Sequence, residues 1–110
     1  MSFSVQRVDT VTVVTAEGEL TVGNRGEFKE TVLAQLASGA DTFVIDFAST
    51  GYIDSSGLGV LVGLSKRIRQ DGGRLRIAGL NEDLRTLFEL TKLDALFQIS
   101  ETRAAALAEF

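Results

Sequence analysis

Two adjacent serines, Ser55 and Ser56, are the side chains of this sequence with the clearest chemical potential. They stand in the segment Asp54-Ser55-Ser56-Gly57-Leu58-Gly59, between an apolar run typical of a strand and one typical of a helix. A serine at a helix start commonly caps the helix, because its side-chain oxygen accepts a hydrogen bond from a free backbone N–H. One cap uses one hydroxyl group. The acid and the glycines that flank the pair favour a phosphorylation switch on a protein-docking surface for the other.

The residue types that are absent narrow the chemistry further. The 110 residues include no His and no Cys. By itself the chain therefore provides no Ser-His-Asp triad, no disulfide bond, no thiolate site and no typical zinc site. The net charge is −4 and Lys and Arg form no dense cluster, which argues against binding of nucleic acid. We expect no cofactor, no metal and no nucleic-acid partner.

A catalytic role for Ser55 would require a lysine as the general base. Lys66 is one candidate, but it lies about three turns further along the predicted helix, roughly 16 Å away along the axis. Lys92 is the other candidate. The sequence has no Gly-x-Ser-x-Gly elbow and no glycine-rich phosphate loop with a lysine. We therefore expect a binding protein rather than an enzyme.

The N-terminal segment, Met1 to Arg7, has no basic stretch followed by an apolar one, so it shows no sign of a signal peptide. No apolar stretch approaches the roughly 18 residues that a membrane-spanning helix needs. The composition, with 45% hydrophobic and 24% charged residues, is that of one globular domain over residues 1–110. We expect a cytoplasmic, monomeric protein without a membrane partner.

Hydrophobic periodicity divides the chain into alternating strands and helices. Strands are predicted where apolar and polar residues alternate or β-branched residues accumulate, and helices where apolar residues recur every three to four positions. The strands are expected at Phe3–Gln6, Val11–Ala16, Thr42–Phe47, Leu75–Ala78 and in a short stretch between Leu93 and Ile99. The helices are expected at Arg25–Ala37, from the serine pair to Gln70, from Asn81 or Glu82 through Phe88, and at Thr102–Phe110.

The resulting order, β-β-α-β-α-β-α-β-α, predicts a mixed α/β fold with a four- to five-stranded sheet and about four helices. The first two strands are expected to form an antiparallel hairpin, and residues 18–21 are expected to lead the chain out of it. The later strands are expected to pair in parallel. Residues 48–53 are expected to be a loop. Because partners of such sheets bind where strands end and helices begin, Asp46 and the serine pair are expected at that edge.

The helix after the serines has two faces of different character. At about 100° per residue, its large apolar residues gather on an arc that faces the core: Leu58, Leu61, Val62, Leu64 and Ile68. The opposite arc collects Ser56, Gly59, Gly63, Lys66 and Gln70. Glycine inside an exposed helix costs about 1 kcal/mol relative to alanine, so these glycines indicate that another backbone approaches closely. That backbone belongs either to this chain, at residues 20–24, or to a partner protein.

A phosphate on a serine at this helix start would act on a partner without unfolding the domain. It adds about −1.5 to −2 charges, and the free amides and dipole of a helix N-terminus favour an anion. It would still repel Asp54 and any acidic group of a docked partner. At ~5 Å and an effective dielectric constant of ~20, each like-charge pair costs about 3 kcal/mol, a hundredfold in affinity.

The sequence around the serines resembles the anti-sigma factor antagonists, members of the STAS domain family. The most specific part is Phe43-Val44-Ile45-Asp46-Phe47 followed by Tyr52-Ile53-Asp54-Ser55-Ser56-Gly57-Leu58-Gly59-Val60-Leu61. Gly18-Glu19-Leu20, the Gly72-Gly73 turn with the strand Leu75–Ala78, and Leu84-Arg85-Thr86-Leu87-Phe88 followed by Leu93 also fit. The resemblance covers the chain from Val11 to the C-terminal helix and implies a STAS-type fold.

The resemblance implies a function by partner switching. The unphosphorylated antagonist binds an anti-sigma factor that is also an ATP-dependent serine kinase, which frees a sigma factor and permits transcription. The kinase phosphorylates the antagonist, which dissociates, and a phosphatase restores it. The family's phosphoacceptor directly follows the Asp and corresponds to Ser55, with Ser56 as the weaker candidate. The residues expected to bind the partner are Glu19, Thr21, Asp54, Ser56, Gly57, Gly59, Gly63 and Lys66, with Asp46 in support.

Thr21 departs from the family pattern, because members often carry an Asp after the Gly-Glu/Asp-Leu/Ile element. This difference bears on which kinase is recognised and leaves the acceptor in place. The alternative with the same fold is a constitutive STAS scaffold, such as a subunit of a transporter or a stress-signalling complex, in which Ser55 stays unphosphorylated. Incubation with a cognate kinase and ATP separates the two.

Overall fold

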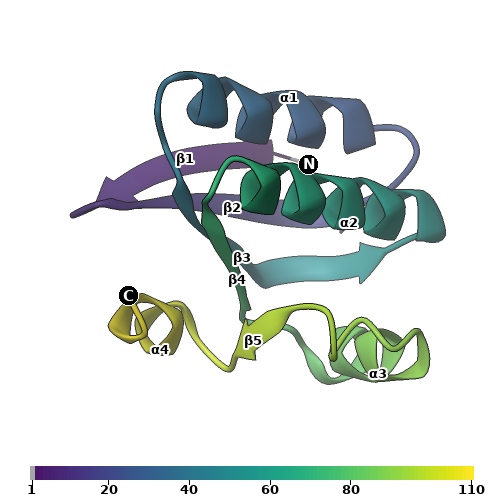
Figure 1. Ribbon diagram of the computed structural model, residues 1–110. Helices are drawn as coiled ribbons and strands as arrows, with labels where there is room; N and C mark the ends of the chain where they lie inside the picture. The colour runs from purple at the N-terminus through teal and green to yellow at the C-terminus, as the bar shows by residue number, and fades with distance from the viewer. Residues whose placement is uncertain (1) are drawn as a thin grey trace.

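The computed structural model describes residues 2–110 and shows a five-stranded sheet with four helices (Figure 1). The element order is the predicted β-β-α-β-α-β-α-β-α. The strands are β1 (Ser2–Val8), β2 (Val11–Leu20), β3 (Thr42–Ile53), β4 (Arg74–Ala78) and β5 (Gln98–Ser100). The helices are α1 (Arg25–Ala37), α2 (Ser55–Gln70), α3 (Glu82–Leu90) and α4 (Arg103–Ala108).

The strands lie in the sheet in the order of the sequence, β1-β2-β3-β4-β5. As predicted, β1 and β2 form an antiparallel hairpin, and every later pairing is parallel. The hairpin turns at Asp9, whose positive φ of 54° suits the short polar side chain of an aspartate. Each parallel connection carries a helix across the sheet, and this gives the fold its layers.

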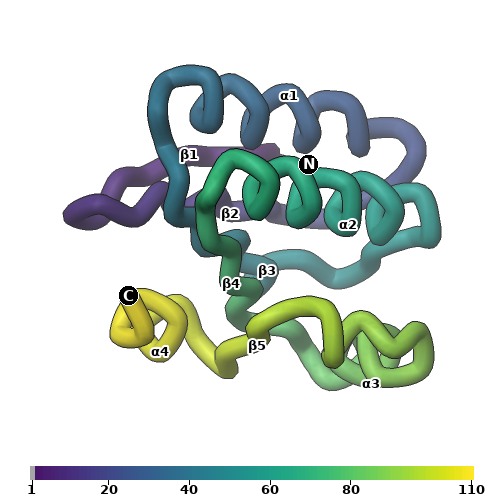
Figure 2. Tube along the Cα trace, viewed as in Figure 1, coloured from purple at the N-terminus to yellow at the C-terminus, as the bar shows by residue number. Residues whose placement is uncertain are grey.

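Helices α1 and α2 lie side by side in contact with each other, and α4 covers the opposite face of the sheet (Figures 1 and 2). The alternation of β3 explains this arrangement, because successive side chains point to opposite faces. Phe43, Ile45 and Phe47 join the main core with α1, α2 and α3, whereas Val44 packs in a smaller cluster with Ala106 of α4. Both faces of the central strand are therefore buried, as its continuous apolar run predicts.

The prediction that residues 48–53 form a loop is wrong, because β3 continues to Ile53. The prediction that the second strand ends near Ala16 is also wrong. β2 continues to Leu20, which pairs in parallel with Ile53 of β3. Two register shifts, between Thr15 and Glu17 and between Gly18 and Glu19, accompany this extension. Such irregularities break the alternation of apolar and polar residues by which strands are recognised in a sequence.

The last strand is shorter than the apolar residues near it indicate. β5 contains only Gln98–Ser100, whereas Leu93, Leu96 and Phe97 lie in the turns that follow α3. Phe97 and Leu93 still pack on the main core, so their apolar character reports burial rather than strand structure. None of the helices described between residues 2 and 110 combines the length and the apolar character of a membrane span.

Candidate functional site

Asp54 lies between the end of β3 and the start of α2 and connects both to the end of β2. Its Oδ1 accepts hydrogen bonds from the backbone N–H of Gly57 at 2.8 Å and from the hydroxyl of Ser56 at 2.6 Å. Its Oδ2 accepts one from the backbone N–H of Val22 at 3.0 Å, and its own N–H donates to the carbonyl oxygen of Leu20 at 3.0 Å. A single residue thus caps α2 and fastens the loop after β2 to it.

The interpretation of Ser55 or Ser56 as the helix cap is wrong, because Asp54 is the N-cap residue of α2. Aspartate caps as well as serine does, and here its carboxylate reaches the N–H of Gly57. The two serines, which the sequence treats alike, differ in the structure. The hydroxyl of the half-buried Ser56 donates a hydrogen bond to Asp54. The hydroxyl of the exposed Ser55 makes no hydrogen bond to any other residue within the described range 2–110.

The hydrogen bonds around Asp54 lower the pKa of its carboxyl group below the ordinary value of 3.8. The side-chain hydrogen bond from Ser56 is the largest cause, followed by the backbone N–H of Gly57, and each favours the charged form. Because the pKa is lower in the folded state, the ionised carboxylate stabilises the fold above the unfolded-state value. This stabilisation is lost as the pH falls through the folded-state pKa, so Asp54 is charged near neutrality.

The loop that Asp54 fastens contains Thr21, one of the predicted partner-binding residues. Asn24 orders this loop, because its Oδ1 accepts from the N–H of Thr21 at 2.9 Å and its amide donates to the carbonyl oxygen of Glu19 at 2.7 Å. Glu19 is exposed at the end of β2. Val22, whose backbone N–H donates to Asp54, exposes 66% of its surface in the same loop. The sequence analysis does not identify Val22.

The three glycines of α2 have different environments. The structure places Gly57 in the interior rather than on the surface where partner binding is expected. A Cβ atom at Gly57 would lie 2.9 Å from the carbonyl oxygen of Leu20, so the chain itself makes the close approach there. Gly59 and Gly63 are exposed, and a Cβ atom at either would meet nothing within 4 Å. The alternative that residues 20–24 of this chain approach Gly59 and Gly63 is therefore wrong, and Leu20 approaches Gly57 instead, which lies outside that arc.

Gly59 and Gly63 form part of a groove between α1 and α2 with a volume of about 460 Å³. The walls of the groove come from one face of each helix: Arg25, Lys29 and Leu33 on α1, and Ser56, Gly59, Val60, Gly63, Leu64 and Arg67 on α2. The sequence analysis does not identify the residues of α1. These three residues are four positions apart, so they lie on one side of the helix, and this spacing could have identified them as a common surface. Lys66 is exposed on α2 outside the groove lining.

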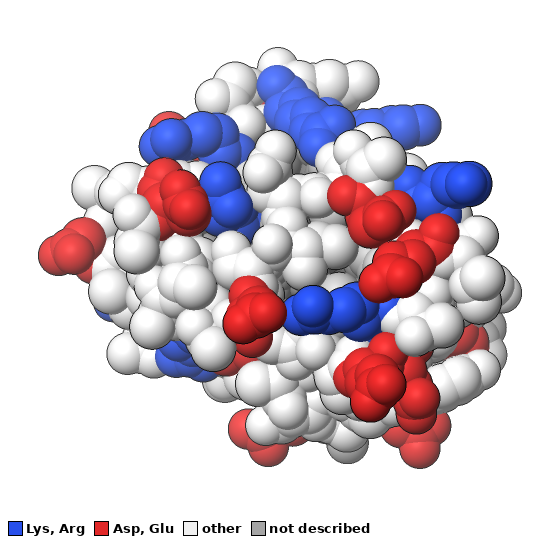
Figure 3. Space-filling model, turned by 90° about the horizontal axis from the view of Figure 1, so that it is seen from below, with Lys and Arg blue, Asp and Glu red and all other residues white. Residues whose placement is uncertain are grey.

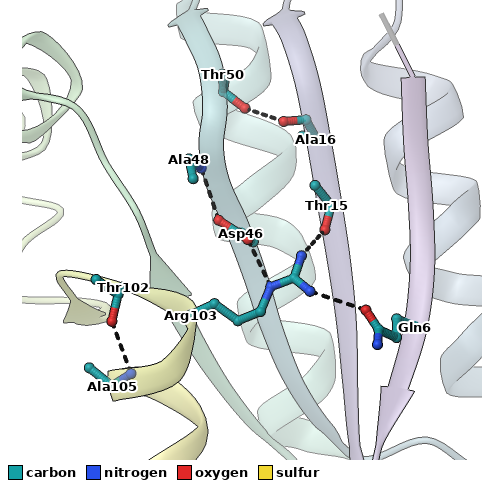
Figure 4. A network of polar contacts seen from close by, with 9 residues as sticks. All are labelled: Gln6, Thr15, Ala16, Asp46, Ala48, Thr50, Thr102, Arg103 and Ala105. Carbon is teal, nitrogen blue, oxygen red and sulfur yellow. Dashed lines mark hydrogen bonds and ion pairs between the residues drawn. The ribbon is translucent and has the colours of Figure 1, made fainter.

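Asp46 does not lie at the serine site. It is seven residues before the end of β3, and its carboxylate points to the face covered by α4, where its Oδ2 accepts from Nε of Arg103 at 2.9 Å (Figure 4). Arg103 also donates to Thr15 at 2.6 Å and to Gln6 at 3.1 Å. Asp46 therefore has a structural role away from the serines, as one of the partners through which Arg103 joins α4 to β1, β2 and β3.

The fold and the site define a class of protein. Residues 2–106 match the STAS domain family, and the chain belongs to that family. Over 87 residues it is 34% identical to the anti-sigma-B factor antagonist of Bacillus subtilis, an alignment that covers 79% of each chain.

Solved structures agree with this assignment. A crystal structure of a candidate anti-sigma factor antagonist from Thermotoga maritima superposes with a TM-score of 0.92 at 30% identity, covering 97% of this chain and 92% of the other. The fold also matches that of the Bacillus cell fate determinant SpoIIAA in its phosphorylated form, with a TM-score of 0.76, 21% identity and 98% coverage of both chains. Relatives of this chain are thus anti-sigma factor antagonists, and at 21% identity the similarity to SpoIIAA concerns the fold alone.

Proposed function

We propose that this protein is an anti-sigma factor antagonist whose binding to an anti-sigma factor is switched off by phosphorylation of Ser55. In this proposal the anti-sigma factor is also the ATP-dependent serine kinase, a phosphatase reverses the modification, and the exchange takes place in the cytoplasm. The observation that carries the proposal is the exposed Ser55 hydroxyl at the first position of α2, directly beside the Asp54 cap and the partly exposed loop of Thr21 and Val22.

The contacts of the two serines support Ser55 over Ser56 as the acceptor. A kinase must reach the hydroxyl oxygen and remove its proton, and Ser55 is exposed. The Ser56 hydroxyl donates at 2.6 Å to a carboxylate that also caps the helix. A phosphate on Ser56 would remove this hydrogen-bond donor and place a negative group beside the Asp54 carboxylate. The repulsion between the two would break the helix cap.

A phosphate on Ser55 is compatible with the fold and unfavourable for an acidic partner. Ser55 occupies the first turn of α2, where the helix dipole stabilises a negative group. The carboxylate of Asp54 stays ionised near neutrality, so the phosphate and Asp54 together form a concentrated negative charge. Such a charge at the centre of an interface can lower affinity a hundredfold, because each like-charge pair at ~5 Å costs about 3 kcal/mol.

The first prediction concerns the acceptor. The purified protein and its Ser55→Ala and Ser56→Ala variants are incubated with ATP and each anti-sigma factor kinase of the same organism, and phosphosites are mapped by mass spectrometry. We expect phosphate on Ser55 in the native protein and in Ser56→Ala, and none in Ser55→Ala. Calorimetry should show that Ser55→Ala binds the kinase like the native protein, whereas Ser55→Asp binds at least tenfold more weakly.

Two outcomes contradict the proposal in different ways. If no kinase of this class binds or modifies the native protein, the chain is better described as a constitutive STAS scaffold. If a kinase binds but Ser55→Asp keeps native affinity, the electrostatic account of the switch fails. Circular dichroism of Ser55→Ala and Ser55→Asp serves as the control, and we expect unchanged spectra because Ser55 makes no side-chain hydrogen bond within residues 2–110.

A further inference from the structure

The groove between α1 and α2 has a positive lining in a chain of net negative charge. Arg25, Lys29 and Arg67 line it, and among the described residues, 2–110, no acidic one does. Helix α2 contains three basic residues and no acid. The net charge of the chain is nevertheless −4. Asp and Glu side chains gather instead on the face that carries α3, α4 and β5, most densely over one half of it (Figure 3).

In the part of the chain that the structure describes, two of the three cations in the groove have no acidic partner. Within residues 2–110, no carboxylate lies within 4.0 Å of Arg25 or Lys29. Arg67 has one weak partner, Asp71, at 3.6 Å within the same exposed helix. An exposed pair of this kind contributes little to stability, so Arg67 can exchange Asp71 for another carboxylate at small cost. The groove therefore offers three positive groups to an anionic partner.

The shape of the groove suits a helix better than a small ion. Its lining on α2 runs from Ser56 to Arg67, about 16 Å along the axis, which equals three helical turns. Its middle is formed by Gly59 and Gly63, where a methyl group added to either residue would meet nothing within 4 Å, so a second backbone can approach. Leu33, Val60 and Leu64 supply apolar contact along the same length.

The geometry points to an acidic amphipathic helix of the anti-sigma factor as the occupant of this groove. Its carboxylates pair with Arg25, Lys29 and Arg67, and its apolar side chains rest on the leucines and Val60 between the two helices. This inference rests on the proposed function and names the chemistry of the partner. Ser56 lines the same groove next to Ser55, so a phosphate on Ser55 places negative charge at the end of the groove and repels the acidic helix.

The first test uses the partner itself. Lys29→Glu should weaken binding of the anti-sigma factor about tenfold, because one attraction becomes a repulsion. Arg85→Glu is the matched control, since Arg85 is an exposed basic residue of α3 that lies outside the groove. We expect native affinity for Arg85→Glu and a weakening of native binding as salt is raised. Equal affinity of the native protein and Lys29→Glu would overturn the inference while the proposed function stands.

A second test does not depend on the identity of the partner. A bridged helical peptide of about twelve residues, with Glu on one face and Leu on the other, is titrated into the ¹⁵N-labelled protein. We expect amide shifts at Lys29, Gly59 and Gly63, and none with a peptide that carries Lys in place of Glu. No shifts with the acidic peptide, or equal shifts with both peptides, would overturn the inference. The peptide tests whether the groove takes an acidic amphipathic helix even if no anti-sigma factor binds and the proposed function fails.

Discussion

At the scale of single residues, Asp54, Ser55 and Ser56 differ in their hydrogen bonds, and these differences determine what the site can do. Asp54 accepts from Ser56, Gly57 and Val22 and so holds two segments together. Ser56 belongs to that structural group through its 2.6 Å hydrogen bond. Ser55 is left with an exposed hydroxyl at the head of α2, where a modification changes the surface charge and leaves the cap intact.

The second prediction concerns the charge of Asp54. Asp54→Asn keeps an oxygen that can cap α2 but removes the negative charge on which the hydrogen bonds from Ser56 and Val22 depend. We expect the variant to unfold at lower urea concentration than the native protein at pH 7. Below pH 3.8 the gap should narrow, and it should close as the pH falls through the lowered pKa of the folded state, because the native carboxyl group becomes neutral there too.

The control for this experiment is Asp9→Asn, since Asp9 is an exposed aspartate of the β1–β2 turn. Its difference from the native protein should be small at each pH. If the gap between Asp54→Asn and the native protein is the same at pH 3 and pH 7, the carboxylate charge is not what stabilises the site.

At the scale of elements, α2 has one end fixed to the rest of the chain and one face free. Gly57 packs against Leu20 at the end of β2, which keeps the helix start close to the sheet. Gly59 and Gly63 face the groove, where the described residues leave open space. The same residue type thus serves internal packing at one position and access from outside at the others.

The third prediction compares these glycines. Gly57→Ala should destabilise the fold, because its methyl group would lie 2.9 Å from the carbonyl oxygen of Leu20. Gly63→Ala should stabilise the fold by up to about 1 kcal/mol, because alanine favours a helix and meets no neighbour within 4 Å. Thermal unfolding of both variants provides the comparison, and the prediction fails if the two change stability in the same direction.

The fourth prediction concerns the free face of α2. Gly63→Leu adds a branched side chain that fills the middle of the groove without meeting a neighbour close to its backbone. We expect affinity for the anti-sigma factor to fall at least tenfold, while the melting temperature stays near that of Gly63→Ala. Gly26→Leu, on α1 outside the groove lining and also without neighbours within 4 Å, is the matched control. Native affinity of Gly63→Leu would place the groove outside the interface.

At the scale of the whole molecule, the sheet separates the face with α1, α2 and the proposed switch from the face that α4 covers. On the face that α4 covers, Arg103 of α4 donates to Asp46, Thr15 and Gln6, which lie on β3, β2 and β1 (Figure 4). The carboxylate of Asp46 is 8% exposed, so it depends on these partners for compensation of its charge. The helix that contains Arg103 has only six residues and needs such an anchor.

The fifth prediction concerns this anchor. Arg103→Leu leaves the buried Asp46 carboxylate with the N–H of Ala48 as its remaining donor among residues 2–110. We expect a loss of about 1–3 kcal/mol in the free energy of unfolding, and faster hydrogen exchange in α4. Arg85→Leu, which removes an exposed basic side chain from α3, should change neither. Slow exchange in α4 of Arg103→Leu would show that apolar contacts of Ala106 hold the helix by themselves.

Much of the fold follows from local patterns in the sequence. The periodicity of apolar residues predicts α1 at its observed bounds, and the apolar run at Thr42–Phe47 predicts a central strand. The periodicity does not predict the strand ends at residues 17–20 and 48–53. These ends form because β2 and β3 pair there, with two register shifts that break the local pattern. The periodicity also fails in the turns around Leu93, where apolar residues are buried without being in a strand.

From the sequence alone, the pair Ser55 and Ser56 is the candidate for chemistry in this chain, since His and Cys are absent and the pair opens a predicted helix with small residues. The structure distinguishes the two serines, because the carboxylate of Asp54 accepts the hydroxyl of Ser56 and not that of Ser55. The contact that is distant along the chain is the one between Asp54 and the N–H of Val22, 32 residues away, which fastens the loop after β2 to the start of α2. The groove is likewise tertiary: Arg25 and Lys29 face Gly59 and Gly63 because α1 and α2 pack side by side. Local sequence patterns encode elements, whereas contacts between distant segments create the site.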